Sequence, residues 1–241
     1  MEHPITEQIT GVDLVEQQIK IAAGYKLEFT QNDVNINGHS VEYRVYAEDP
    51  ARKFLPSIGF LRKYREPSHT PNVRVDTGIE EGSEISMYYD PMISKLITTG
   101  KDRAEALALM DSALKEYVVR GVGHNLGFGI SIVNNEHFSK GDYNTAFIPN
   151  YYPEGFKGEV LTTEDNIICA LMAAKLRNKS KDYAFVEGNS RHTPHLHDVY
   201  VSVNERDYRV QLAEGETHAT ITEIESGKQF VREVTNFEFE S

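Results

Sequence analysis

Apolar and polar residues alternate along residues 41–50, with the period of two that is typical of a β-strand. One face of this predicted strand holds Val41, Tyr43 and Val45. The other face holds Glu42, Arg44 and Tyr46. Pro50 ends the pattern, because proline has no backbone N–H to donate to a strand ladder. The pattern therefore predicts a strand that fixes the guanidinium of Arg44 on its polar face.

Further periodic segments surround this strand. The hydrophobic spacing predicts helices over residues 10–23, 101–119 and 126–134, and Gly24 is expected to end the first of them. Short extended segments are expected around residues 59–64, 73–76 and 93–98, with prolines and glycines between them. Short strands with helices at either end indicate an α+β domain over residues 1–150, built on an antiparallel sheet with flanking helices.

The chain changes character near residue 150, where residues 149–155 are rich in helix and strand breakers. Thr162 and Asp165 have the spacing of a capping box, which predicts a helix over residues 163–177. Alternating residues over 198–240 predict a β-meander, so that residues 151–241 form a second domain. Cys169 lies within the predicted helix among apolar residues, and we expect it to pack rather than to act as a nucleophile.

Composition narrows the classes of function. The formal net charge of −12 argues against nucleic acid or an anionic membrane surface as a main partner. No apolar run is long enough to cross a membrane. The single cysteine excludes an internal disulfide and is consistent with a reducing compartment. These features indicate a soluble intracellular protein.

Three side chains are candidates for chemistry, and each has an ordinary alternative. Arg44 could bind a carboxylate, bicarbonate or an oxyanion, or it could pair with a neighbouring acid of the sheet. Glu2 and Asp90 each lie close to a proline that constrains the backbone, but either could be an ordinary turn acid. His192, His195 and His197 lie close together without a cysteine or acidic ligand motif, and we expect no metal site there. The sequence has no phosphate loop of the GxxxxGK type.

Read together, several motifs resemble one family. They are residues 2–7 (EHPITE), 9–15 (ITGVDLV), 37–50 (NGHSVEYRVYAEDP), 54–59 (FLPSIG), 73–78 (VRVDTG), 88–96 (YYDPMISKL) and 141–147 (GDYNTAF). The same motifs occur in this order in biotin carboxylases. Over roughly residues 2–150 the chain therefore resembles the C-terminal lobe of an ATP-grasp biotin carboxylase.

This resemblance implies roles for the three candidates. Glu2 matches the general base that takes the proton from bicarbonate before it attacks ATP. Arg44 matches the arginine that holds bicarbonate and stabilises the biotin enolate. Asp90 matches an acid near that arginine, and we expect it to orient Arg44 by a charge-assisted hydrogen bond. The implied cofactors are biotin on a carrier domain, ATP and Mg²⁺.

Residues 152–158 (YPEGFKG), with the helix and meander after them, resemble the region that follows the carboxylase domain in propionyl-CoA carboxylase α subunits. That region is a biotin-transfer domain, a helix beside a β-barrel that contacts the carboxyltransferase β subunit. The same region of 3-methylcrotonyl-CoA or acetyl-CoA carboxylase is an alternative. A role in assembly alone, without catalysis, is another.

The resemblance is incomplete. The family's nucleotide-binding lobe, its metal-binding carboxylates and its biotinylation motif do not occur in these residues. We therefore expect part of a longer, oligomeric subunit with part of the transfer barrel, and no carboxylation by this chain alone. The expected compartment is the bacterial cytoplasm or the mitochondrial matrix.

Overall fold

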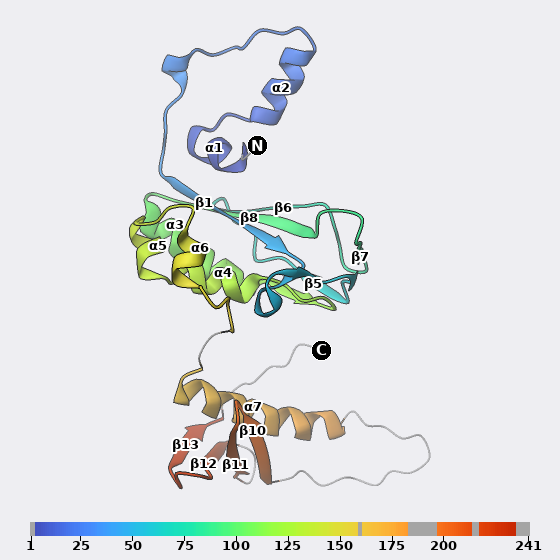
Figure 1. Ribbon diagram of the computed structural model, residues 1–241, viewed down its shortest axis with the longest axis vertical. Helices are drawn as coiled ribbons and strands as arrows, with labels where there is room; N and C mark the ends of the chain where they lie inside the picture. Colours follow the sequence, from blue (N-terminus) through green and yellow to red (C-terminus); the bar gives the residue numbers. More distant parts are fainter. Residues whose placement is uncertain (1–2, 159–160, 183–196, 214–216, 235–241) are drawn as a thin grey trace. The chain divides into compact units, whose positions relative to one another are not determined.

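The computed structural model describes residues 3–158, 161–182, 197–213 and 217–234, without the side chains of residues 180–182. It divides into two compact units, residues 1–159 and 160–241, which we describe separately (Figure 1). The division lies beyond the expected boundary at residue 150. The reason is that Tyr152 and Phe156 pack their rings against Phe128, 5.1 and 5.5 Å between centroids, and so continue the first unit.

The first unit is organised around a three-stranded antiparallel sheet in the order β1-β8-β6. These strands are β1 (His39–Tyr46), β8 (Met92–Gly100) and β6 (Val73–Thr77). Three antiparallel two-stranded ribbons accompany the sheet: β2 (Glu48–Asp49) with β3 (Leu55–Pro56), β4 (Gly59–Phe60) with β7 (Glu84–Ile85), and β5 (Lys63–Arg65) with β9 (Val118–Arg120). The predicted antiparallel sheet and the strand carrying Arg44 are confirmed.

Helices cover the apolar face of this sheet (Figure 1). They are α3 (Arg103–Glu116), α4 (Leu126–Val133), α5 (Glu136–Lys140) and α6 (Phe147–Tyr151). Val45 and Leu96 of the sheet pack with Met110 of α3, and all three side chains are fully buried. Burial of this kind contributes roughly 2 kcal/mol for each large apolar side chain. The core of the first unit therefore lies between the sheet and α3.

The helix predicted over residues 101–119 is too long at its C-terminal end. Tyr117 leaves the helical conformation, with φ −64° and ψ 133°. Val118 and Val119 then pair with Arg65 and Tyr64 in the β5–β9 ribbon. β-branched residues favour a strand over a helix, and a partner strand was available more than 50 residues earlier in the chain.

The single helix predicted over residues 10–23 is wrong at its N-terminal end. Two helices are present, α1 (His3–Thr10) and α2 (Leu14–Ala22). Gly11 separates them with φ +72°, and the side chain of Asp13 caps α2 by accepting a hydrogen bond from Glu16 N at 2.8 Å. Gly24 follows α2 with φ +89°, so the predicted end is confirmed. A short 3₁₀ turn, η1 (Gln31–Asp33), precedes β1, and η2 (Pro50–Arg52) follows β2.

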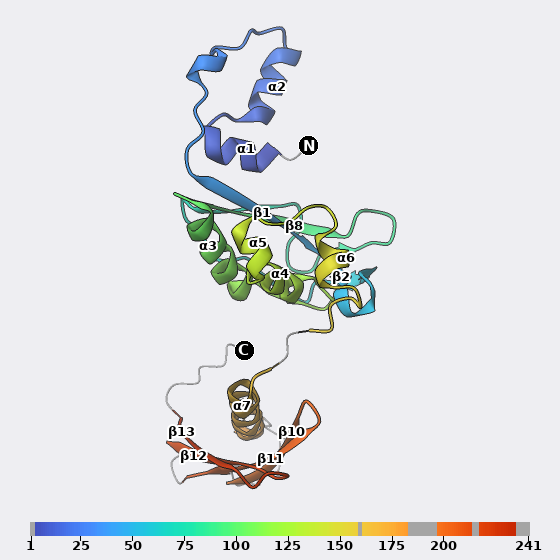
Figure 2. The same cartoon turned by 60° about the vertical axis from the view of Figure 1, so that its left-hand side comes forward.

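Helix α1 lies over the face of the sheet opposite α3 (Figures 1 and 2). Arg74 of β6 connects the two elements, since its Nη1 donates to Glu7 Oε2 at 2.9 Å. The same guanidinium also donates to both carboxylate oxygens of Asp76, at 2.7 and 2.8 Å. These hydrogen bonds attach α1 to the sheet through β6.

The second unit contains one helix and one sheet. Helix α7 (Thr163–Asp182) runs across one face of a four-stranded antiparallel sheet (Figure 2). The strands, in order, are β10 (Asp198–Val203), β11 (Arg206–Leu212), β12 (His218–Glu223) and β13 (Gln229–Glu233). Ile167 and Leu171 of α7 pack with Tyr208 of β11 in a separate core. The predicted meander is thus confirmed over these strands, and residues 235–241 lie outside the described part of the chain.

The capping box of α7 is also confirmed. Asp165 N donates to Thr162 Oγ1 at 3.2 Å, and Thr162 N donates to Asp165 Oδ2 at 2.8 Å. The helix continues past the predicted end at residue 177 to Asp182. The prediction that Cys169 packs among apolar residues is wrong, because this side chain is exposed whereas its neighbours Ala170 and Leu171 are buried. A helical stripe buries residues three and four apart, and Cys169 falls outside that stripe.

Candidate functional site

Arg44 lies in the middle of β1, on the face that points away from the α3 core. Val41, Tyr43 and Val45 pack with that core, so the alternation predicted from the sequence is confirmed. Arg44 Nε donates to Glu42 Oε1 at 3.1 Å, and Glu42 occupies the same face two residues earlier. The Glu42 side chain is only 8% exposed, compared with 38% for Arg44. The buried carboxylate therefore lies behind a guanidinium that remains accessible.

Arg44 and Glu42 line a cleft of about 460 Å³. Its walls come from α1, β1, the start of α3 and the α5–α6 region, and comprise Ile5, Ser40, Val41, Glu42, Arg44, Arg103, Phe138 and Tyr143. The lining therefore combines apolar side chains with two guanidinium groups and one carboxylate. Such a cleft suits a small organic molecule that carries a negative charge.

Arg103 is the second cation of this cleft, and sequence reasoning missed it. Its Nη2 donates to Phe138 O and its Nε donates to Ser139 O at 3.2 Å. The guanidinium carbon lies 5.0 Å from the ring centroid of Phe138 and 5.6 Å from that of Tyr143. These contacts fix the side chain against α5. One sequence signal was available. An arginine in the first turn of a helix is unfavourable next to the positive end of the helix dipole, which suggests that Arg103 interacts with groups outside its own helix.

Asp90 lies at the end of the sheet where β1 finishes and β8 begins. Its Oδ1 accepts a hydrogen bond from Met92 N at 2.9 Å, and Ala47 N donates to Pro91 O at 2.8 Å. Asp90 therefore forms a turn next to Ala47, three residues beyond Arg44 along β1. Partial burial, together with the charge of Asp90, raises the pKa of Glu48. The predicted hydrogen bond from Arg44 to Asp90 stays a prediction.

Two other predicted sites lie wholly or partly outside the described residues. Glu2 precedes the first described residue, His3, and Ile5 of α1 lines the cleft that contains Arg44. His192 and His195 fall in a part that the structure does not describe. Within the described ranges, no three His, Cys, Asp or Glu side chains form a group that could hold a metal ion. None of the helices in those ranges is long and apolar enough to cross a membrane.

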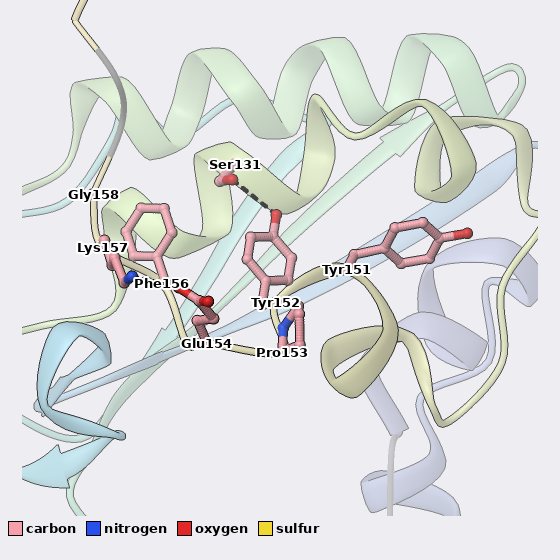
Figure 3. Close-up of a pocket in the computed structure, with 9 residues that line it drawn as sticks. Ser131, Tyr151, Tyr152, Pro153, Glu154, Phe156, Lys157 and Gly158 are labelled. Carbon is pink, nitrogen blue, oxygen red and sulfur yellow. Dashed lines mark hydrogen bonds and ion pairs between the residues drawn. The ribbon is translucent and has the colours of Figure 1, made fainter.

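A second hollow, of about 300 Å³, lies beside the segment that follows α6 (Figure 3). It is lined by Ser131 and residues 151–158. The hydroxyl groups of Ser131 and Tyr152 share a hydrogen bond of 2.8 Å, and Lys157 pairs with Glu154 at 2.6 Å. Its charged groups thus neutralise each other, and it contains none of the side chains predicted to carry chemistry. The cleft at Arg44 is the better candidate.

Two protein families match parts of the chain. Residues 42–150 match the family described as biotin carboxylase C-terminal domain. Residues 1–30 match the family described as carbamoyl-phosphate synthase L chain, ATP binding domain. The first match contains Arg44, Asp90, Arg103 and most of the cleft. Residues 42–150 therefore form a biotin carboxylase-like region.

Relatives extend the comparison over more of the chain. The mitochondrial propionyl-CoA carboxylase alpha chain of Homo sapiens is 55% identical over 176 residues, 72% of this chain and 24% of that one. A pyruvate carboxylase subunit of Methanothermobacter thermautotrophicus is 48% identical over 151 residues, 63% of this chain and 30% of that one. The chain is thus homologous to subunits of biotin-dependent carboxylases, but it spans only about a quarter to a third of their length.

Among solved structures, the fold resembles a biotin carboxylase domain of a thermophilic 2-oxoglutarate carboxylase bound to bicarbonate. That structure has a TM-score of 0.61 and 40% sequence identity, and the match covers 63% of this chain and 34% of that chain. The match supports an α+β fold with antiparallel sheets for the first unit.

Proposed function

We propose that this chain supplies the C-terminal part of a biotin carboxylase site within a subunit of an acyl-CoA carboxylase of the propionyl-CoA type. One observation carries the proposal: an accessible guanidinium, Arg44, is held by a buried carboxylate in the wall of a cleft. The relatives that share this region are biotin-dependent carboxylases, and the related 2-oxoglutarate carboxylase domain is described with bicarbonate bound.

In the proposed reaction, Arg44 binds bicarbonate and later stabilises the oxyanion of the biotin enolate. A planar guanidinium presents paired donors to the oxygens of such an anion. Glu42 accepts from Arg44 Nε, and this contact holds the guanidinium in the wall of the cleft. A donor that is fixed before charge develops lowers the barrier, because it does not need to reorganise during the reaction.

Glu2 and Asp90 complete the proposed site. Glu2 would act as the base that deprotonates bicarbonate, and its place in the chain next to α1 supports this, since Ile5 of α1 lines the cleft. Asp90 would orient Arg44 from the end of β1. Its described hydrogen bond uses one carboxylate oxygen, Oδ1, for the backbone of Met92.

Within the described residues, no three His, Cys, Asp or Glu side chains form a group that could hold Mg²⁺. The match to an ATP binding domain family covers residues 1–30. We therefore assign ATP, Mg²⁺ and the biotin carrier to other parts of the longer protein, and we derive no step through them. On this proposal the chain alone does not hydrolyse ATP in a bicarbonate-dependent way.

The second unit supports the acyl-CoA type of carboxylase. The resemblance implies a helix beside a β-barrel in a biotin-transfer domain, and the arrangement of α7 with β10–β13 supports this proposal. The proposed partners are the biotin carrier domain and the carboxyltransferase β subunit, in the bacterial cytoplasm or the mitochondrial matrix. A pyruvate carboxylase is the second candidate, because a subunit of one such enzyme is 48% identical to this chain.

Substitution of Arg44 tests the proposal. In the complete carboxylase subunit, Arg44→Ala should lower kcat for biotin carboxylation by about 10²–10³-fold, the usual cost of losing a fixed oxyanion donor. Arg209→Ala is a matched control, because Arg209 is also a mid-strand arginine paired with an acid, Asp198, at 2.6 Å, but it lies in the second unit. Carboxylation unchanged by Arg44→Ala would contradict the proposal. So would bicarbonate-dependent ATP hydrolysis by the 241-residue chain.

A further inference from the structure

Asn125 makes a group of contacts with β1 that neither the motifs nor the proposed reaction explains. β1 is an edge strand of its sheet, because β8 lies along one side of β1 and no strand of this sheet lies along the other. On the other side, the Asn125 side chain contacts the backbone on both sides of Val45. Its Oδ1 accepts from Tyr46 N at 2.9 Å, and its Nδ2 donates to Arg44 O at 3.0 Å. A single amide side chain thus replaces a neighbouring strand at Arg44.

The backbone of Asn125 strengthens this attachment. Asn125 N donates to Tyr46 O at 3.2 Å, and the hydroxyl of Tyr43 donates to Asn125 O at 2.7 Å. Burial raises the pKa of Tyr43, so its hydroxyl keeps the proton that it donates. Asn125 is itself 6% exposed. These hydrogen bonds are therefore shielded from competition with water.

The position of Asn125 makes this use of its side chain unusual. It occupies the N-cap of α4, where asparagine is strongly preferred because its side chain accepts a backbone N–H of the first turn. Here the side chain makes no such hydrogen bond to the helix. The helix has given up a favourable cap, and the amide that would provide it fixes β1 instead. The Asn125 side chain therefore serves to fix the backbone of β1 and not to cap α4.

The contacts of Asn125 coincide with an irregularity of the sheet. The register between β1 and β8 shifts between Val45 and Tyr46, one residue beyond Arg44. The extra residue at the shift is Ile93 of β8, and it interrupts the ladder beside β1, so the direction of nearby side chains of β1 depends on other contacts. Asn125 spans the shift, with one hydrogen bond before it and two after it.

We propose that Asn125 is a positioning residue for Arg44: it fixes the backbone of β1 at the register shift, while Glu42 fixes the guanidinium. The inference rests on the proposed function, because it gives Asn125 a role only through Arg44. Without the amide, the carbonyl of Arg44 and the N–H of Tyr46 lose their partners and β1 relaxes at its edge. A displacement of about 1 Å at a reacting group can cost about 10²-fold in rate.

A double-mutant cycle in the complete carboxylase subunit tests the inference. Asn125→Ala should lower kcat for biotin carboxylation about 10- to 100-fold, with little change in the KM for ATP. In the Arg44→Ala background, Asn125→Ala should cause no further loss, since a residue that acts through another loses its effect when that residue is absent. A merely structural role would instead give independent, additive losses.

Two further variants keep the test decisive. Thr98→Val is the stability control, because it removes another buried hydrogen bond of the sheet, from Thr98 Oγ1 to Ala106 O at 2.8 Å, away from Arg44. It should lower Tm while kcat is unchanged. Asn125→Asp has nearly the same shape, keeps the acceptor for Tyr46 N and loses the donor to Arg44 O. It should lower kcat and serves as the deciding variant if Asn125→Ala does not fold.

The outcomes separate the inference from the proposed function. If Arg44→Ala abolishes carboxylation but Asn125→Ala and Asn125→Asp retain normal kcat, the inference is wrong and the proposed function stands. Additive losses in the double mutant would overturn the inference in the same way. If Arg44→Ala itself has no effect, the proposed function fails and the inference fails with it.

Discussion

The two larger antiparallel sheets of the described residues differ in what covers the face opposite their core. The β1-β8-β6 sheet packs one face on α3 and has α1 over the other. The β10–β13 sheet packs one face on α7, whereas Tyr200 and Val231 on the described strands are 66% and 63% exposed. Both sheets follow the same alternation of apolar and polar residues. They differ in what covers the polar face.

This difference decides what an arginine can do in each sheet. Arg209, on the exposed face of the second sheet, pairs with Asp198 at the surface, where water and salt screen the charges. Arg44 of the first sheet lies in the wall of a cleft beside a nearly buried carboxylate. When a second layer of the protein covers a charged side chain, its orientation is restricted and water screens its charge less. The comparison therefore explains why, among the described residues, the candidate site lies in the first unit.

The largest expected effects on stability come from substitutions that disrupt the core of one unit and leave the other core unchanged. Leu96 in the first sheet and Ile221 in the second are both fully buried, in separate clusters. Leu96→Ala and Ile221→Ala should each lower the free energy of unfolding by about 2–5 kcal/mol, the usual cost of a cavity in a core. Hydrogen exchange should increase in β1 and β8 for the first variant, and in β11 and β12 for the second. Equal increases in both sheets from either variant would contradict the separation of the cores.

A smaller effect tests how closely α4 approaches β1. A Cβ on Gly129 would lie 2.6 Å from Cζ of Tyr43, so the ring or the helix would have to move. Gly129→Ala should therefore destabilise the first unit by about 1–3 kcal/mol, the cost of overpacking a core.

Gly127→Ala is the matched control for this variant. It lies in the same helix, but its added Cβ would meet only the Phe156 ring, at 3.8 Å. It should be neutral or stabilising by up to about 1 kcal/mol, because alanine is the better helix former. Thermal unfolding measures both, and equal effects of the two substitutions would show that Tyr43 does not pack tightly on α4.

The smallest effects concern pH and have opposite signs in the two units. Burial, and then the charge of Asp90, raises the pKa of Glu48, so its contribution to stability is present at low pH and is lost as pH rises through the raised pKa. The hydrogen bond from Arg232 lowers the pKa of Glu164, so its contribution is present above the ordinary carboxyl pKa and is lost as pH falls through the lowered one.

Carboxyl NMR titration checks these two directions. Asp90→Asn should lower the pKa of Glu48, and Arg232→Ala should raise that of Glu164. The expected change in overall stability from Arg232→Ala is close to zero, since exposed ion pairs contribute little. A measured pKa of Glu48 below that of Glu164 would contradict the expected difference between the two carboxyl groups.

Much of the local structure was determined by the sequence alone. The alternation over residues 41–50 defined both faces of β1, and Thr162 with Asp165 defined the start of α7. The ordered motifs of the first 150 residues also pointed to the family that the comparisons matched over residues 42–150. These features depend on residues close together in the chain, so periodicity and spacing contain the required information.

Other features were decided only by tertiary structure. Val118 and Val119 looked like the end of a helix until β5 provided a partner strand. Cys169 lies in an apolar run whose buried stripe is set by the sheet under α7, not by the run itself. In both cases local pattern allowed two outcomes, and contacts with a distant element selected one.

The candidate site shows the same division. Sequence reasoning identified Arg44 as an arginine fixed in a strand and allowed that it pairs with a neighbouring acid of the sheet, which is Glu42, but it gave no sign of Arg103 in the same cleft. It also gave Asn125 no role, because 81 residues separate Asn125 from Arg44 along the chain. A side chain can be assigned to a face from its neighbours in the sequence. What that face meets depends on segments that only folding brings together, because hydrogen bonds and packing act over a few ångströms in space, whatever the separation along the chain.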